Sequence, residues 1–291
     1  MKYAISLLFG GLLMVGSLLA QNNADNEYRM MTQEPVANKT TEDMVTDISS
    51  RELFLMENSM TDYHSATWKR DIYREVPNIE GNETLFYPTV STDKRANLFS
   101  LLINLLSDNT IKAYKYDDQP DFNINNERDI KEVLDENKIA YTPVDNRTVS
   151  VLKEDIAKAN IISYFVKERW YYDIKTGKGD VRPVAICPII CDRGRSFPMF
   201  WINFDDISVY QARAISPVAV ANITPVLSNA SMFDIFRNRY YKGSIYQVGI
   251  RNLSQYFTTP ESLKQERTRI ETELDYVQSR FEAVAVAYKE D

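Results

Sequence analysis

The sequence predicts an α+β protein, with an antiparallel meander sheet, packed helices and a long C-terminal helix. Between Ile161 and Phe204, three apolar runs alternate with a period of two residues and are separated by two polar turns. Segments with helical periodicity precede and follow this meander. Beyond Pro260 a heptad pattern continues toward the end of the chain. Together these observations indicate a sheet covered by helices.

The N-terminal residues differ from the rest of the chain. Lys2 and the apolar run from Ala4 to Ala20 have the pattern of a secretory signal peptide, residues 1–20, and no nearby cysteine could accept a lipid, so we expect a soluble exported protein. Residues 21–50 are polar and predict a flexible lead. We expect one α+β domain over residues 51–258, or two subdomains divided near residue 150, followed by the C-terminal helix over residues 259–291.

Several elements are predicted before the meander. Trp68, Ile72 and Val76 recur one helical turn apart, which predicts a helix from Tyr63 to Val76. Pro77 would end it. The other predicted elements are a short extended segment over Leu85–Pro88, a helix over Ala96–Leu106, a strand over Ile111–Tyr116 and a helix over Asp129–Glu136.

The meander carries large aromatic side chains on one face. In its first strand Trp170 and Tyr172 share the parity of the apolar residues, and we expect Trp201 on the same inner face. A hairpin turn is predicted at Gly177-Lys178-Gly179. The predicted elements after the meander are helical turns over Asp205–Ala212, a loop or edge segment over Ser216–Thr224, a helix over Asn229–Tyr240 and a strand over Ser244–Val248.

The C-terminal helix has a clear start and a narrow apolar stripe. Thr259 is a favourable N-cap and Pro260 suits the first helical position. The stripe predicts one of two arrangements. The helix either binds a partner, for example in a coiled coil, or packs on its own domain. Its residues are Leu263, Ile270, Leu274, Val277, Phe281, Val284 and Tyr288.

The charge balance argues against nucleic acid as a partner. The chain has 34 basic and 41 acidic residues, a net charge of −7. Loss of Lys2 with the signal peptide would make this −8. Such a surface repels phosphate backbones.

The residues that could carry chemistry are few. Cys187 and Cys191 would form a disulfide only if the chain turned between them, since four extended residues span roughly 13 Å; bridge and free thiols both remain open. Two thiols and the single histidine, His64, cannot fill a tetrahedral metal site. No glycine-rich phosphate loop occurs. We therefore assign no catalytic, cofactor-binding or metal-binding residue, and expect no cofactor.

One segment has the spacing of a calcium loop. Asp121, Asn123 and Asn125 are followed by Glu132 at the twelfth position. In the alternative interpretation, Asn125 or Asn126 simply caps the next helix. The acidic pairs Asp117-Asp118 and Asp205-Asp206 are also compatible with solvated surface positions.

An ordered series of short motifs resembles a known family. Its members are Trp68 to Arg74, Leu85 to Pro88, Leu98-Phe99, Ile111 to Tyr114, Lys167 to Asp173, Arg182 with Ile186 to Pro188, Phe200 to Ile202 and Met232 to Phe236. In this order they resemble the GldN/PorN family of gliding-motility and type IX secretion proteins of the Bacteroidetes. The resemblance covers about residues 62–253. Cys191 is not part of the family pattern, residues 208–225 match it loosely, and the heptad pattern beyond Pro260 lies outside the motif series.

The resemblance implies a non-enzymatic, periplasmic subunit. Such a protein would form a homo-oligomeric ring with a GldK/PorK-like outer-membrane lipoprotein and contact a GldM/PorM-like motor subunit. The alternative is a periplasmic hydrolase or ligand-binding protein that uses carboxylates, which predicts a cleft where Asp and Glu side chains converge.

Overall fold

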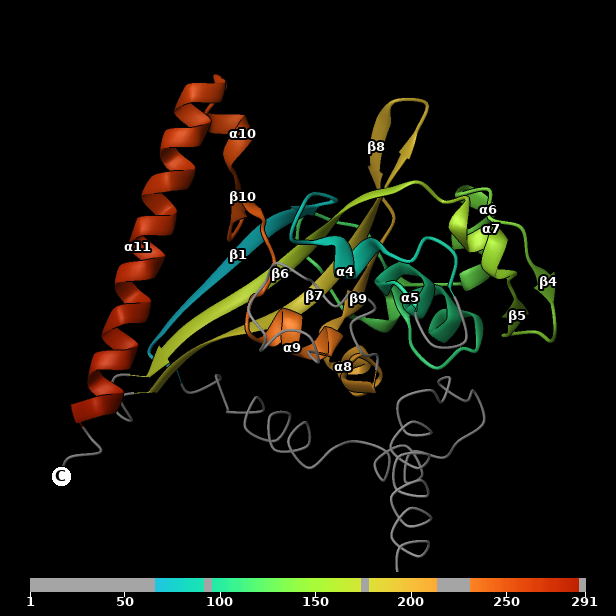
Figure 1. Cartoon of the computed structure of the whole chain (residues 1–291), viewed down its shortest axis with the longest axis horizontal. Coiled ribbons are helices and arrows are strands. Elements are labelled where there is room, and N and C mark those ends of the chain that lie inside the picture. The colour runs from blue at the N-terminus through green and yellow to red at the C-terminus, as the bar shows by residue number, and fades with distance from the viewer. Residues whose placement is uncertain (1–65, 92–95, 174–177, 214–230, 288–291) are drawn as a thin grey trace, which may run out of the picture.

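The computed structural model describes residues 66–91, 96–173, 178–213 and 231–287 (Figure 1). Within them, nine strands form one antiparallel sheet in the order β11-β10-β1-β6-β7-β9-β2-β3, with β8 paired to β7, which confirms the predicted fold class. The strands are β1 (Trp68–Pro77), β2 (Ala113–Lys115), β3 (Glu127–Arg128), β6 (Ile161–Asp173), β7 (Lys178–Asp192), β8 (Arg195–Pro198), β9 (Phe200–Asn203), β10 (Ser244–Val248) and β11 (Arg251–Asn252).

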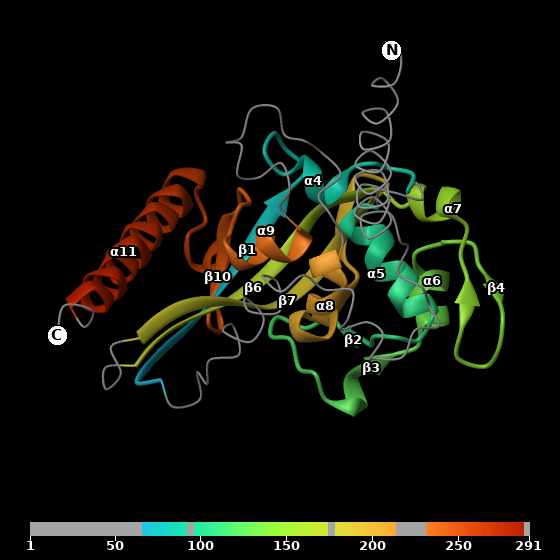
Figure 2. The same cartoon turned by 60° about the horizontal axis from the view of Figure 1, so that its bottom comes forward.

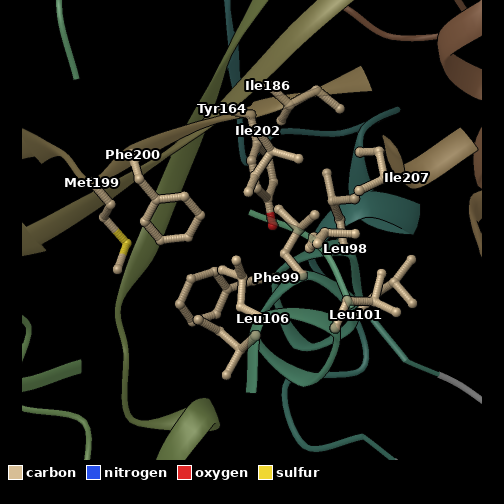
Figure 3. Close-up of a cluster of buried hydrophobic side chains, with 14 of the residues drawn as sticks. Leu98, Phe99, Leu101, Leu106, Tyr164, Ile186, Met199, Phe200, Ile202 and Ile207 are labelled. Carbon is tan, nitrogen blue, oxygen red and sulfur yellow. The ribbon is translucent and has the colours of Figure 1, made fainter. Parts of the chain in front are cut away.

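Helices gather on one side of this sheet, which we call the helical face (Figures 1 and 2). Its largest cluster packs Tyr164, Ile186, Phe200 and Ile202 of the strands against Leu98 and other apolar residues of α5 (Figure 3). The helices are α4 (Glu83–Phe86), α5 (Leu98–Ser107), α6 (Ile130–Glu136), α7 (Lys153–Ala157), α8 (Phe204–Arg213), α9 (Met232–Arg237), α10 (Leu253–Tyr256) and α11 (Pro260–Ala287). A separate hairpin joins β4 (Thr142–Pro143) to β5 (Val149–Ser150).

The opposite side, the aromatic face, is covered by the segment after β2. Tyr116 stacks on Trp201 with ring centroids 5.9 Å apart. The Trp201 indole N–H donates to the Asp117 carbonyl over 2.8 Å, and the Gln247 side-chain amide donates to the Asp118 carbonyl over 2.8 Å. These bonds hold a polar loop over a sheet surface that carries aromatic rings.

The expectation that Trp201 shares a face with Trp170 was wrong. β9 pairs with β7 so that Ile202 lies beside Ile186 of the helical face. Trp201, one residue earlier, therefore points to the aromatic face. Trp170 instead packs against Ile72 on the other side of the sheet.

The first predicted helix was also wrong, because residues 68–77 form β1, a central strand between β6 and β10. A spacing of four residues fits one helical turn, but it also fits a strand, where every second side chain shares a face. Burial of the other face decides between them: Tyr73 is almost fully buried on the aromatic face, and Ile72 is buried on the helical face. Buried strands have this pattern.

The segment at Leu85 differs in part from its prediction. Leu85 and Phe86 complete the short helix α4, and only Tyr87 is extended before a cis peptide bond to Pro88. The remaining described elements confirm the predicted types, with α8 longer and with β2 and α9 shorter than expected. Lys178 and Gly179, predicted as part of a turn, instead belong to β7. α9 begins at a capping box formed by Ser231 and Asp234, later than the predicted Asn229. The predicted signal peptide, flexible lead and 216–224 segment lie outside the described residues.

The C-terminal helix begins as predicted. The Thr259 hydroxyl oxygen accepts a hydrogen bond from the Ser262 amide over 3.2 Å, and Pro260 is the first helical residue. α11 runs alongside β10, near the edge of the sheet, and also contacts β7 (Figures 1 and 2). Across the described ranges, each helix is too short or too polar to cross a membrane.

Candidate functional site

The candidate site is the contact between α11 and the helical face of the sheet. Ile270 and Leu274 are almost fully buried there and pack with Trp170 and Ile245. The alternative in which the helix packs on its own domain is therefore correct for the first half of α11. Val277 is only partly buried, and the side chains of the later heptad positions lie outside the described residues.

An arginine of β1 connects the sheet to this helix. The Arg74 side chain is 5% exposed, and its Nε lies 3.0 Å from a carboxylate oxygen of Glu168 on β6. Its two terminal nitrogens donate to both carboxylate oxygens of Glu271 on α11, one of them over 2.9 Å. Such a two-point contact fixes orientation as well as charge. Nearby, Arg70 of β1 makes a second ion pair with Glu273 of α11 over 2.6 Å.

Glu168 is the centre of this ion network, with a side chain only 1% exposed. Its carboxylate accepts hydrogen bonds from the Trp170 indole over 3.0 Å and from the Tyr241 hydroxyl over 2.6 Å. The Arg239 guanidinium lies 3.4 Å away and also covers the Trp170 ring. We call Arg74, Glu168, Arg239, Tyr241 and Glu271 the buried ion network.

The environment of Glu168 keeps it ionised. Burial raises the pKa of its carboxyl, but the charges of Arg74 and Arg239 and the bonds from Tyr241 and Trp170 outweigh this and leave the pKa below its ordinary value. Burial lowers the pKa of Arg74, and Glu168 and Glu271 together raise it well above the usual range. Both groups are permanently charged at neutral pH, so they are suited to holding elements together and not to proton transfer.

A second group of charges lies on the aromatic face of the same two strands. Asp71 of β1 accepts from Arg169 over 2.7 and 2.8 Å and pairs with Lys167 over 3.0 Å. Burial raises the pKa of Asp71, but these two cations bring it below its ordinary value. The Lys167 ammonium also lies 5.4 Å from the centre of the Tyr73 ring. The β1–β6 pair is therefore cross-linked by ions on both faces.

Sequence reasoning did not single out Glu168, although a signal was present. Glu168 has the same parity in β6 as Tyr164 and Trp170, so a carboxylate stands in an otherwise apolar row. Such a residue needs a buried partner. Its partners Arg74 and Glu271 are distant in the sequence, and the sequence offers no means of pairing them.

The two cysteines are free thiols. Both belong to β7, which continues without a turn between them, so the disulfide alternative is excluded by the extended geometry. Cys187 is fully buried, and burial raises the pKa of its thiol. Cys191 is partly exposed.

The calcium-like segment has a structural explanation. The residue that caps α6 is Asp129, not Asn125 or Asn126, and Asn123 caps a short 3-10 turn. The Asn126 amide donates to the Asp121 carboxylate over 2.9 Å. Groups of three or more metal-ligating side chains are absent from the described ranges.

The remaining candidate acids do not converge. Asp117 and Asp118 are exposed on the loop over the aromatic face. Asp205 pairs with Arg182 over 2.6 Å, and the pKa of Asp206 is raised by burial and by Asp205. His64 lies outside the described residues.

A pocket of about 400 Å³ lies away from these groups, between α5 and α7. Tyr87, Asn97 and Lys158 are among its lining residues, and its lining includes no Asp or Glu. The cleft of convergent carboxylates that a hydrolase would need is thus not formed here.

The family comparison agrees with the resemblance noted in the sequence. The model of the GldN family, described as gliding motility associated protein GldN, matches residues 61–281. No curated protein shows significant similarity to the chain. The match spans the whole sheet and most of α11, including every member of the buried ion network. This chain therefore belongs to the GldN family of gliding motility associated proteins.

Proposed function

We propose that the protein is a non-enzymatic structural subunit of the type IX secretion and gliding machinery. In this role it lies in the periplasm, forms a ring with a GldK/PorK-like outer-membrane lipoprotein and contacts the periplasmic part of a GldM/PorM-like motor subunit. The observation that carries the proposal is the family match over residues 61–281.

The arrangement of buried charge supports a structural role. Glu168, Arg74 and Asp71 are held in fixed pairs, and each carboxylate is saturated by donors from other elements. Catalytic acids instead have shifted pKa values near neutrality and face a cleft. Charges arranged in this way favour one rigid geometry, which suits a structural subunit.

The proposal is tested by a crosslinked pull-down from envelope fractions with the tagged mature protein, followed by mass spectrometry. Recovery of an outer-membrane lipoprotein in near-equal amount, together with a motor subunit, is the expected result. A protein recovered alone, under conditions that preserve other envelope complexes, would overturn the proposal and make a screen for substrates the next experiment.

A further inference from the structure

The hairpin between β7 and β8 projects from the body of the sheet (Figure 1). Its tip consists of Asp192, Arg193, Gly194 and Arg195, all exposed. Asp192 pairs with Lys138 over 2.9 Å, which ties the hairpin to the end of α6. Arg193 and Gly194 have φ values of 51° and 77°, as a tight turn requires.

The tip carries two arginines whose positive charge is not neutralised by an ion pair within the described part of the chain. Arg193 and Arg195 have no ion pair with any described residue, whereas Arg128, Arg182 and Arg237 all do. Phe197, close to the tip on β8, is 46% exposed. These two arginines and the exposed aromatic ring form a small surface. Arginine and aromatic residues are enriched in protein–protein interfaces. We call this surface the hairpin tip.

A surface of opposite charge lies elsewhere on the same chain. Residues 117–129 contain five carboxylates and one guanidinium, and this guanidinium, Arg128, is already bound to Glu136 over 2.6 Å. In the middle of the segment Ile124 is 76% exposed. We call this surface, on the loop over the aromatic face, the acidic loop. Its carboxylates are Asp117, Asp118, Asp121, Glu127 and Asp129, all exposed.

We propose that the hairpin tip of one copy docks on the acidic loop of a second copy. Arg193 and Arg195 meet carboxylates such as Asp118 and Glu127, and Phe197 packs beside Ile124. The chain as a whole is acidic, with a net charge of −7, so a cationic projection is attracted to its acidic surfaces and other contacts between copies are disfavoured. The two surfaces differ, so the contact is head-to-tail, the type that forms rings.

This inference rests on the homo-oligomer of the proposed function, and it identifies the two surfaces through which neighbouring copies would meet. The lipoprotein and motor contacts do not depend on it. Failure of the docking contact would therefore leave the pull-down result unchanged, and failure of the pull-down would leave the docking contact testable with purified protein.

The test is sedimentation velocity of purified residues 21–291 with paired charge reversals. One variant carries Arg193→Asp and Arg195→Glu, with aspartate chosen because it tolerates a positive φ. The other carries Asp118→Arg and Glu127→Arg. Each variant alone is expected to sediment as a monomer, whereas the original chain and an equimolar mixture of the two variants should sediment as oligomers. The variant that combines all four substitutions should self-associate again.

Salt and a matched control complete the design. Self-association should weaken about tenfold or more between about 0.1 M and about 1 M NaCl, because the Debye length falls from roughly 10 to 3 Å. Arg147→Glu, at an exposed position in the β4–β5 hairpin, should leave association unchanged. Circular dichroism of each variant verifies folding.

Three outcomes would overturn the proposal. The original chain could remain monomeric at every concentration, or the arginine variant could associate as well as the original. Alternatively, flotation with phosphatidylcholine–phosphatidylglycerol vesicles could show that the arginine variant loses lipid binding while self-association persists. That last result would assign the hairpin tip to an anionic membrane surface instead of a second copy.

Discussion

Replacing Glu168 by glutamine should be among the most destabilising single changes in the sheet. Glutamine keeps the shape of the side chain but removes the charge between Arg74 and Arg239. Its amide group would also point donors at the Arg74 guanidinium, which offers only donors. Breaking a buried ion pair by removing one partner costs about 3 to 5 kcal/mol. Arg74 keeps its contact with Glu271, so we expect the lower part of that range, about 3 kcal/mol.

The assay is urea unfolding followed by tryptophan fluorescence and far-UV circular dichroism. Total stabilities of domains are about 5 to 15 kcal/mol, so a loss of this size moves the midpoint well beyond experimental error. The matched control is Glu273→Gln on α11, whose carboxylate is 42% exposed and pairs with Arg70. An exposed pair contributes at most about 1 kcal/mol. Equal losses in Glu168→Gln and Glu273→Gln would refute the central role assigned to the buried carboxylate.

Three further results are expected. Leu274→Ala should lower the free energy of unfolding by about 2 to 5 kcal/mol, because its side chain is fully buried, and Val277→Ala, at a partly buried position, should cost less; equal costs would contradict the packing of α11. Maleimide should label Cys191 in the native protein and Cys187 only after unfolding, and a native protein with both thiols blocked would contradict the free-thiol state. The folded-state pKa of Glu168 lies below 4.5, so the unfolded chain takes up its proton first as the pH falls. Stability measured by urea unfolding should therefore decline below about pH 5, and less steeply in Glu168→Gln; parallel pH profiles would contradict this.

The elements with local signals could be predicted from sequence. The β6–β7 hairpin was found because alternating apolar residues flank a glycine-containing turn, and α11 because Thr259 and Pro260 mark its start. β1 was missed because the spacing of Trp68 and Ile72 fits either period. The burial of its other face, which distinguishes the two, depends on strands that come much later in the chain.

The candidate site could not be predicted from the sequence for the same reason. Arg74 and Glu168 become neighbours only through the pairing of β1 with β6, and Glu271 reaches them only when α11 lies on the sheet. Nothing in a single sequence specifies these registers. The placement of Trp201 failed likewise, because it depended on how β9 aligns with β7.

The position of β1 has a consequence for how the chain folds. β1 is the first described strand along the chain, yet its neighbours are β6, which begins at Ile161, and β10, which begins at Ser244. Its pairing is therefore complete only when these much later segments are also present, and contacts so distant in sequence form slowly. A product truncated before Glu271 would leave Arg74 without its helical partner. The link between the first strand and the last helix thus makes the mature fold a property of the full-length product, and incomplete chains become targets for proteolysis.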